Sequence, residues 1–196
     1  DLNTQNKISI GKAIFIGPSI NPKNIDINDF DTIIFIKPPT INLKLKNKNI
    51  VVILNNIWIK KEFESINIWY KKNPNTSFLS PQDIKSIGIK KEKLLDKLLI
   101  GPFGSSPMGL QRGLFLIKHK YIYEKLKIIG FNLGLSIKKY HESYPSIIHA
   151  DTQKDALHLR SNASHDFYYN FYLTRCLLNN DLKIDTNLTE ITNKAP

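Results

Sequence analysis

Four short runs of apolar residues recur along the chain, and none of them alternates with polar positions. Each run is rich in Ile, Val or Phe and is bounded by Gly, Pro, Asn or Asp residues. The runs are Ala13–Ile16, Thr32–Ile36, Ile50–Leu54 and Leu126–Phe131. Continuous apolar runs of this length are typical of strands that are buried on both faces of a parallel sheet.

Segments with helical spacing lie between these runs. Ile57–Lys72 mixes apolar and charged positions before an Asn-Pro-Asn stop, and Leu110–Tyr123 has a similar pattern. Gln82–Leu99 is amphipathic but contains Gly88, so we expect one helix or two pieces. Ser77–Ser80 is a short extended piece. This alternation predicts an α/β fold: a Rossmann-like, doubly wound, mostly parallel sheet with helices on both faces.

A late helix has a well-specified start. Ser164 is a natural N-cap, and Asp166 falls in the first turn, where the helix dipole favours an anion. Apolar and small residues follow at helical spacing up to Leu178, and two asparagines end the pattern. Leu182–Ile184 is then expected to be a closing strand.

One further segment has no periodicity. Lys138–Asn162 is rich in His, Tyr, Ser and Asp, and long loops of this kind in compact domains are often functional lids. Residues 186–196 have the composition of a frayed tail. The 196 residues suit a single nucleotide-binding α/β domain that spans the whole chain.

Composition places this domain in a reducing compartment. Cys176 is the single cysteine and can form no internal disulfide. No stretch approaches the roughly 18 uninterrupted apolar residues that span a bilayer. We therefore expect a cytoplasmic protein, compatible with peripheral contact at the inner face of an anionic membrane.

The net charge of +11 suggests nucleic-acid binding at first sight. The excess comes from lysines that are spread along the chain, and only three positive residues are arginines. No basic run alternates with aromatic residues, as a single-strand binding platform would require. A solvated lysine-rich surface explains the charge better, and we expect no nucleic-acid partner.

The first apolar run ends in a turn with small residues, Gly17-Pro18-Ser19. Ligands of open α/β sheets bind beyond the carboxyl ends of the strands, where Gly17 would allow close approach and Ser19 could donate to a phosphate or sugar hydroxyl. The sequence is neither a Gly-x-Gly-x-x-Gly fingerprint nor a P-loop. A tight turn without a ligand is the alternative.

A second loop rich in glycine and serine, 101–109, precedes a predicted helix. Ser106 and Gly109 would place free backbone N–H groups at that helix start, which suits an anion, and Arg112 could add a bidentate phosphate contact. The alternative is a flexible linker.

His165 stands at the start of the late helix, where the helix dipole keeps its imidazole neutral and able to accept a proton. A histidine near the helix cap with no chemistry is the alternative. The other histidines lack the spacing of a zinc site, so no metal is expected. The triplet Asp29-Phe30-Asp31 precedes a strand and is interpreted as a solvated turn.

The order of these pieces over most of residues 12–185 resembles the sialyltransferase-like glycosyltransferases of bacteria, which build lipopolysaccharide, capsule or related glycans. Gly17-Pro18-Ser19 resembles the end of the family's Gly-x-Gly-Pro-Ser, without its first glycine. Phe30-Asp31 resembles the Phe-Asp that opens the second strand. Lys37-Pro38-Pro39 stands where the family has a nucleotide-binding asparagine.

The later family motifs have counterparts as well. Ser106 to Gly109 resembles a Ser-Gly pair that opens a helix about 20 residues before a strand. That strand ends in Gly-x-Asp in the family, and here Gly130-Phe131-Asn132 has Asn132 in place of the acid. His165, followed by Asp166, matches the family's general base ahead of a helix.

The resemblance implies transfer of a sugar from a CMP-activated donor to a glycan or lipid-linked acceptor, with inversion and without metal or cofactor. His165 would deprotonate the acceptor, unless it instead protects the leaving phosphate. Ser106 and Gly109 would bind that phosphate, and the Gly17 turn would bound the nucleotide cleft. Tyr140 and Tyr144 of the lid-like segment would bind phosphate or stack on a ring.

Other interpretations stay open. Related enzymes transfer Kdo with retention through a carboxylate nucleophile, for which Asp151, Asp155 and Asp166 are the candidates. A non-catalytic nucleotide-binding or assembly module of the same fold is favoured by Lys37 and Asn132. A metal-dependent nucleotide enzyme and a nucleic-acid binder are the remaining alternatives.

Overall fold

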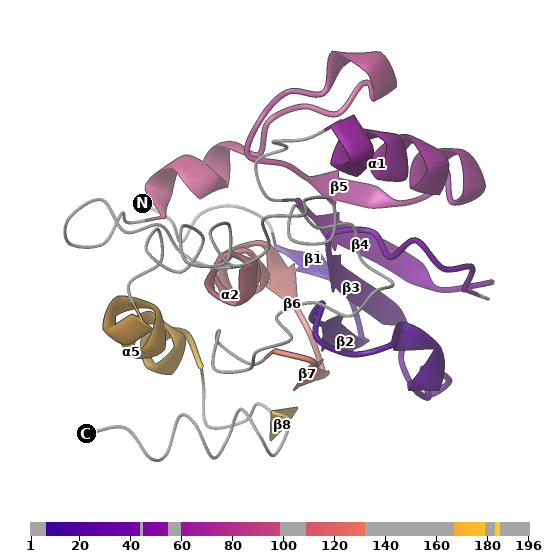
Figure 1. The fold of residues 1–196 in the computed structure, drawn as a ribbon. Coiled ribbons are helices and arrows are strands. Elements are labelled where there is room, and N and C mark those ends of the chain that lie inside the picture. Colours follow the sequence, from indigo (N-terminus) through magenta and orange to yellow (C-terminus); the bar gives the residue numbers. More distant parts are fainter. Residues whose placement is uncertain are drawn as a thin grey trace, which may run out of the picture.

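The computed structural model contains a six-stranded parallel sheet with helices on both faces (Figure 1). The structure describes residues 7–43, 45–54, 60–98, 109–131, 167–178 and 183–184. The strand order is β5-β4-β3-β2-β7-β8, and every neighbouring pair is parallel. The strands are β2 (Lys12–Ile16), β3 (Thr32–Ile36), β4 (Asn49–Ile53), β5 (Ser77–Leu79), β7 (Lys125–Ile129) and β8 (Lys183–Ile184). The expected Rossmann-like α/β fold is therefore confirmed.

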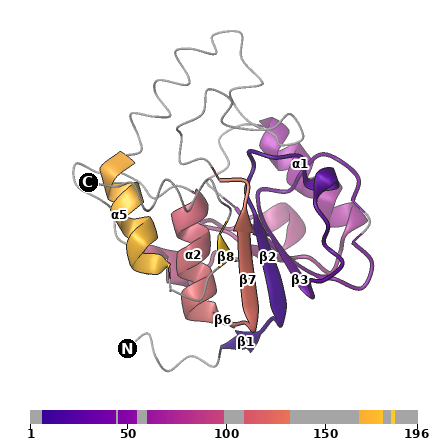
Figure 2. The ribbon, with the colours of Figure 1, turned by 90° about the horizontal axis from the view of Figure 1, so that it is seen from below.

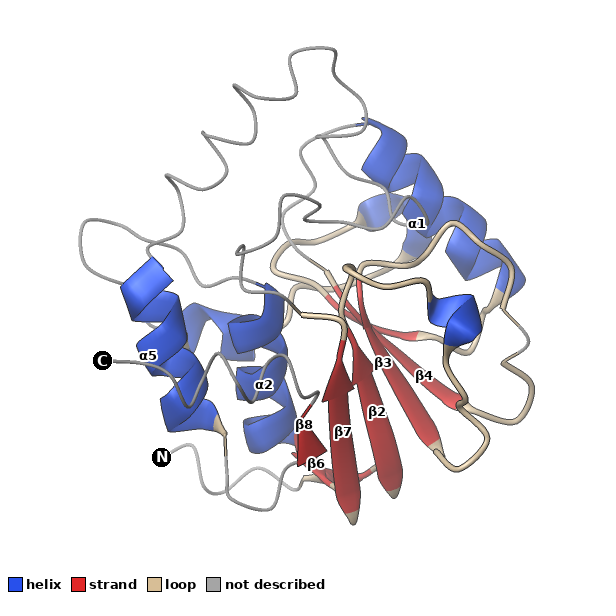
Figure 3. Cartoon of the chain, turned by 60° about the horizontal axis from the view of Figure 1, so that its bottom comes forward, coloured by secondary structure: helices blue, strands red, loops and turns tan. Residues whose placement is uncertain are grey.

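The helices form two layers around this sheet. Helix α1 (Lys60–Lys72) covers one face, whereas α2 (Gly109–Lys120) and α5 (Phe167–Leu177) lie together on the other (Figures 2 and 3). Each face has its own apolar core, as the absence of polar alternation in the strands requires. Phe15 packs on the α2 side, and Phe35 meets Trp69 of α1 with ring centroids 5.6 Å apart.

The strand predictions agree with the structure to within one or two residues. The run Thr32–Ile36 matches β3 at both ends, because the buried Thr32 and four buried apolar residues are followed by Lys-Pro-Pro. The extended piece Ser77–Ser80 contains β5, and the expected closing strand contains β8. These matches follow from burial on both faces of β2, β3 and β4, which are apolar after their first residue, whereas β7 keeps one exposed polar position at Lys127.

Helix α2 ends earlier than the predicted segment Leu110–Tyr123. Its last turn carries Lys118, His119 and Lys120, which suit the negative end of the helix dipole. The chain then forms β6 (Tyr121–Ile122), which pairs in parallel with β1 (Ile8–Ser9). The sequence pattern did not indicate these two short strands, because their stability comes from pairing between distant segments.

The segment Gln82–Leu99 is divided near Gly88, as one of the two expectations has it, but its described residues, 82–98, form two short 3₁₀ helices, at Lys85–Ile87 and Lys93–Lys97, and no α-helix. Gly88 adopts a left-handed conformation, with φ of 69°, and lets Ile84 pair with Ile89 in an antiparallel bridge. That bridge turns the chain back on itself and excludes a continuous helix.

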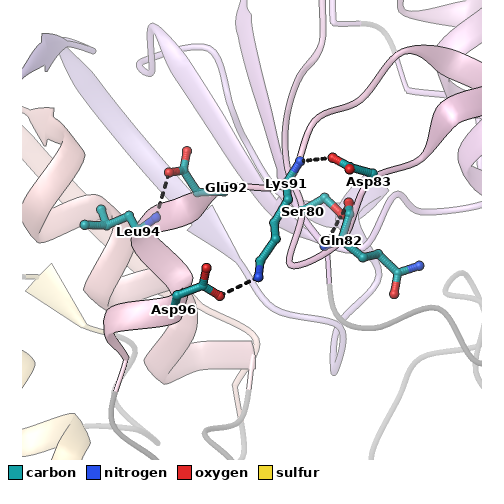
Figure 4. A network of polar contacts seen from close by, with 7 residues as sticks. All are labelled: Ser80, Gln82, Asp83, Lys91, Glu92, Leu94 and Asp96. Carbon is teal, nitrogen blue, oxygen red and sulfur yellow. Dashed lines mark hydrogen bonds and ion pairs between the residues drawn. The ribbon is translucent and has the colours of Figure 1, made fainter.

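Polar contacts hold the segment in this form (Figure 4). The Asp83 carboxylate accepts a bond from the Lys91 backbone N–H at 2.8 Å, and the Lys91 ammonium pairs with Asp96 at 2.7 Å. The Glu92 carboxylate caps the second 3₁₀ turn by accepting from the Leu94 N–H. These side chains satisfy backbone groups that a helix would have satisfied internally.

The late helix is confirmed as α5, with Phe167 as its first residue. The predicted cap residue Ser164, the lid-like segment Lys138–Asn162 and the tail 186–196 lie outside the described residues. Within the described part of the chain, no helix combines the length and the apolar character that a membrane crossing needs.

Candidate functional site

The candidate site lies at the carboxyl edge of the sheet, where the strand order changes direction. From β2 the chain continues to β3 on one side, whereas β7 pairs with β2 on the other side. Adjacent loops leave such a point in opposite directions, and this is the position at which open α/β sheets bind ligands. The predicted turn Gly17-Pro18-Ser19 directly follows β2 at this point.

Gly17 and Gly130 form the base of this edge. A Cβ on Gly17 would overlap the carbonyl oxygen of Gly130, so the two turns meet at a distance that only glycine permits. The Gly17 N–H donates to the Ile129 carbonyl at 2.8 Å, and the Ser19 N–H donates to the Gly130 carbonyl at 3.1 Å. We expected Gly17 to allow a ligand to approach closely. In the structure, the absence of its side chain allows the ends of β2 and β7 to approach each other.

Aromatic packing supports these turns from the α2 side of the sheet. The rings of Phe15 and Phe131 lie 4.7 Å apart, and both residues are buried. Gly130 has a φ of 73°, and its position beside Ile20 leaves no space for a side chain. Pro18 and Ser19 are partly exposed at the surface of this support. The base of the edge is therefore rigid, and its outer surface is accessible.

Helix α2 points its first turn at the same edge. Its glycines face the sheet: a Cβ on Gly113 would overlap the Phe15 ring, and one on Gly109 would lie 2.8 Å from Ile36 Cγ2. Ile36 is the last residue of β3, so Gly109 sits at the carboxyl end of that strand. The helix thus runs antiparallel to the strands, with the N–H groups of its first turn and its positive dipole end at the candidate site.

Arg112 occupies the first turn of α2, as expected from the sequence. Its side chain is partly buried, and this burial lowers the pKa of its guanidinium. A guanidinium stays charged in proteins even so, because its ordinary pKa is far above neutral. Arg112 therefore adds a partly desolvated positive charge beside the helix start, where an anion gains most from it.

Gln111 joins the starts of α2 and α5, a role that the sequence did not indicate. Its fully buried amide Nε2 donates to the Asn170 carbonyl at 3.0 Å and to Thr174 Oγ1 at 2.6 Å. Thr174 Oγ1 in turn donates to the Asn170 carbonyl at 2.7 Å. Gln111 Oε1 has no hydrogen-bond partner among the described residues. Because Gln111 and Asn170 both lie in the first turns of their helices, the two helix starts lie side by side.

The turn after β3 departs from ordinary backbone geometry. Lys37 has a φ of 62°, and its N–H donates to the Ile53 carbonyl at 3.1 Å, which joins the ends of β3 and β4. Lys37 therefore stands at the carboxyl end of β3, on the border of the candidate site.

The Asp-x-Asp triplet belongs to the opposite edge. Asp31 Oδ2 accepts a bond from the Lys12 N–H at 2.8 Å, at the start of β2, and Phe30 is buried in the core. The interpretation of this triplet as a turn with an inward-facing Phe30 agrees with the structure. In the described part of the chain, no three His, Cys, Asp or Glu residues gather where they could hold a metal ion.

Several predicted site residues lie outside the described residues, namely Ser106, Asn132, Tyr140, Tyr144, His165 and Asp166. The structure therefore brings together Gly17, Pro18, Ser19, Gly109 and Arg112 at one edge, and it adds Gln111, Lys37 and Gly130 to them. Helix starts, a guanidinium and a glycine-lined turn are suited to holding a phosphate ester. Comparison of the chain with protein-family models, with curated protein sequences and with solved structures found no match.

Proposed function

We propose that this protein is a glycosyltransferase that moves a sugar from a CMP-activated donor to a glycan or lipid-linked acceptor. One observation carries the proposal: the first turn of α2 lies at the carboxyl edge of the sheet, where Gly109 meets the end of β3 and the Gly17–Gly130 contact joins the ends of β2 and β7. A helix start at a strand-order switch provides a site for an anionic nucleotide. The donor phosphate would bind there, between Gly109 and Arg112.

Chain order gives this site a candidate base. His165 stands two residues before Phe167, the first residue of α5. In the proposed reaction its imidazole takes the proton of the acceptor hydroxyl, and the oxygen then attacks the anomeric carbon. The bond from that carbon to the CMP phosphate breaks, and the phosphate leaves with the electron pair. The positive ends of α2 and α5, with Arg112, stabilise the departing charge.

The same geometry supports a second function. A non-catalytic module that binds nucleotide but transfers nothing is favoured by Lys37, whose cation replaces the amide that would position the base or ribose. Both functions predict nucleotide binding, and they differ in turnover. We place either one on the cytoplasmic side, where nucleotide-activated sugars are made and used.

A nucleotide panel tests the proposal. Thermal unfolding would be followed with CMP, CDP, UMP, UDP, GDP and ADP, each with EDTA and with Mn²⁺. A nucleotide present at 100 times its dissociation constant adds about 2.7 kcal/mol to the free energy of unfolding, which raises the melting temperature measurably. We expect selective stabilisation by CMP in EDTA. Stabilisation by a diphosphate only with Mn²⁺ would assign the protein to another transferase class.

A transfer assay separates the two functions. The protein would be incubated with a CMP-sugar and an oligosaccharide acceptor, and release of CMP would be measured. Release that depends on the acceptor identifies the enzyme. Tight CMP binding without any release identifies the non-catalytic module.

A further inference from the structure

A wide basin lies at the opposite edge of the sheet, where the strands begin. Its volume is about 1210 Å³, and its wall consists of β1, the loop before β4 and the end of α1 with the residues that follow. Three lysines line it, Lys46, Lys48 and Lys72, and none of its lining residues is acidic. A concave surface with one sign of charge concentrates ligands of the opposite sign. The basin is therefore suited to an anion.

Lys48 is held in place inside this basin. Its ammonium donates to the carbonyl oxygens of Asn28, at 2.8 Å, and Phe30, at 2.6 Å. An ammonium group has three N–H donors, so these two bonds leave one for a ligand. Lys46 and Lys72 also line the basin and are exposed. The basin thus combines one cation that is held by two hydrogen bonds with two exposed cations.

The other polar groups indicate what kind of anion fits. Six of the lining residues are asparagines, including Asn47, Asn73 and Asn75. An asparagine amide both donates and accepts hydrogen bonds, and so matches sugar hydroxyls, which do the same. A bare phosphate would use only the donors. The volume of the basin also exceeds the roughly 300–1000 Å³ of a typical small-molecule site, which suits an oligomer.

The lining residues do not suit a nucleic acid. Single-stranded nucleic acids are bound through aromatic side chains on which the bases stack. Tyr121 is the one aromatic residue that lines the basin, and it is only 5% exposed, so its ring is covered. The lining contains no arginine.

A second groove continues the basin toward the candidate site. Its volume is about 220 Å³, and it shares Asn42, Leu43, Lys72 and Asn73 with the basin. It reaches Pro39 and Thr40, which follow the carboxyl end of β3 by only a few residues. The two hollows together lead from one edge of the sheet to the other along α1.

We propose that the basin binds an anionic glycan, a saccharide chain that carries carboxylate or phosphate groups; the groove, whose lining includes the acidic Glu64, is not part of this anion site. The lysines contact the anionic groups, and the asparagines contact the hydroxyls. Binding here requires neither a nucleotide nor transfer at the opposite edge. The proposal is therefore independent of the proposed catalytic function.

A double variant that reverses the charge of two basin lysines tests the proposal. Binding of a fluorescent oligogalacturonate, a carboxylated glycan, would be measured by anisotropy for the wild-type chain and for Lys46→Glu/Lys72→Glu. The matched control is Lys71→Glu/Lys85→Glu, which changes the net charge equally at exposed lysines outside the basin. We expect the first variant to bind about tenfold more weakly, whereas the control stays within about twofold. Circular dichroism would verify that both variants are folded.

The outcomes distinguish the possible ligands. Stronger binding of oligogalacturonate than of neutral maltohexaose, lost only in the basin variant, supports the proposal. Equal losses in both variants would show diffuse attraction to a positive surface and would overturn it, as would no binding by the wild-type chain. Tighter binding of oligothymidylate than of oligogalacturonate would assign the basin to nucleic acid instead. CMP binding, measured in parallel, reports on the other edge and remains unchanged in the basin variant.

Discussion

Gly17 and Gly130 touch through their backbones at the point where β2 and β7 end. There is no space for a Cβ on Gly17, because it would overlap the Gly130 carbonyl oxygen. The Gly17 turn is therefore not a freely shaped loop but part of a rigid edge, bonded to Ile129 and Gly130. This edge, together with the starts of α2 and α5, is the basis of the proposed nucleotide site.

We predict that Gly17→Ala destabilises the protein by about 3 kcal/mol, the upper part of the usual range for overpacking, because backbone atoms cannot move aside as a side chain can. Gly88→Ala is the control: Gly88 has open space around it but a φ of 69°, and should cost only about 1 kcal/mol. Urea unfolding would measure both free energies. A Gly17→Ala variant no less stable than Gly88→Ala would contradict the contact.

Substitutions of Gln111 and Thr174 should have strongly coupled effects on the free energy of unfolding, because the two side chains share a buried hydrogen bond. Thr174→Val removes the hydroxyl that accepts from Gln111 Nε2 and donates to the Asn170 carbonyl, and should cost about 1–2 kcal/mol. Adding Gln111→Met should then cost less than it does alone, because the buried amide that needed partners is gone. The free energies of unfolding of the single and double variants measure this coupling. Strictly additive losses would show that the two side chains do not interact.

Ionisation of the Tyr121 phenol should lower the free energy of unfolding at alkaline pH. Burial, with a smaller contribution from the nearby Glu92 carboxylate, raises the pKa of its phenol to about 12. The folded state therefore prefers the neutral phenol, and its stabilising effect is complete below the unfolded pKa of about 10. This effect is lost as the pH rises from about 10 to about 12, by roughly 2–3 kcal/mol.

Comparison with Tyr121→Phe isolates this effect, because phenylalanine does not titrate. The free energy of unfolding of the wild-type chain, minus that of the variant, should fall between these two pH values. A difference that stays constant would mean that the phenol ionises freely in the folded protein.

Much of the fold follows from local sequence. The central strands are evident because Ile, Val and Phe fill both faces of a parallel sheet, as in Thr32–Ile36. The segment Gln82–Leu99 has charged and apolar residues at helical spacing, which predicts a helix, whereas the bridge from Ile84 to Ile89 decides its shape. A pairing of this kind depends on the left-handed turn at Gly88, which composition alone does not specify.

The sequence predicted those residues of the candidate site that lie at the ends of strands or at the starts of helices. Gly17, Ser19 and Gly109 follow from the rule that ligands bind beyond the carboxyl ends of strands. Gln111 gave no signal, because its importance comes from Asn170, which lies 59 residues away in the chain. Gln111 is buried where α2 and α5 pack against each other.

His165→Ala should abolish transfer and leave CMP affinity within about tenfold, a change of 1.4 kcal/mol. The reason is that a base acts on the acceptor, whereas the nucleotide is held by helix starts and Arg112. The control is His119→Ala, which changes a histidine in the last turn of α2, away from the carboxyl edge. Acceptor-dependent release of CMP would measure transfer. Near-normal transfer by His165→Ala would remove this histidine from the mechanism.

The most direct test of the central claim is hydrogen exchange of the backbone amides, measured by mass spectrometry with and without CMP. We predict slower exchange with CMP in segments 17–20 and 109–113, at the carboxyl edge, and no change in segment 45–49, which lines the basin at the opposite edge. Unchanged exchange at the carboxyl edge, or protection confined to 45–49, would contradict a nucleotide site between the Gly17 turn and the start of α2.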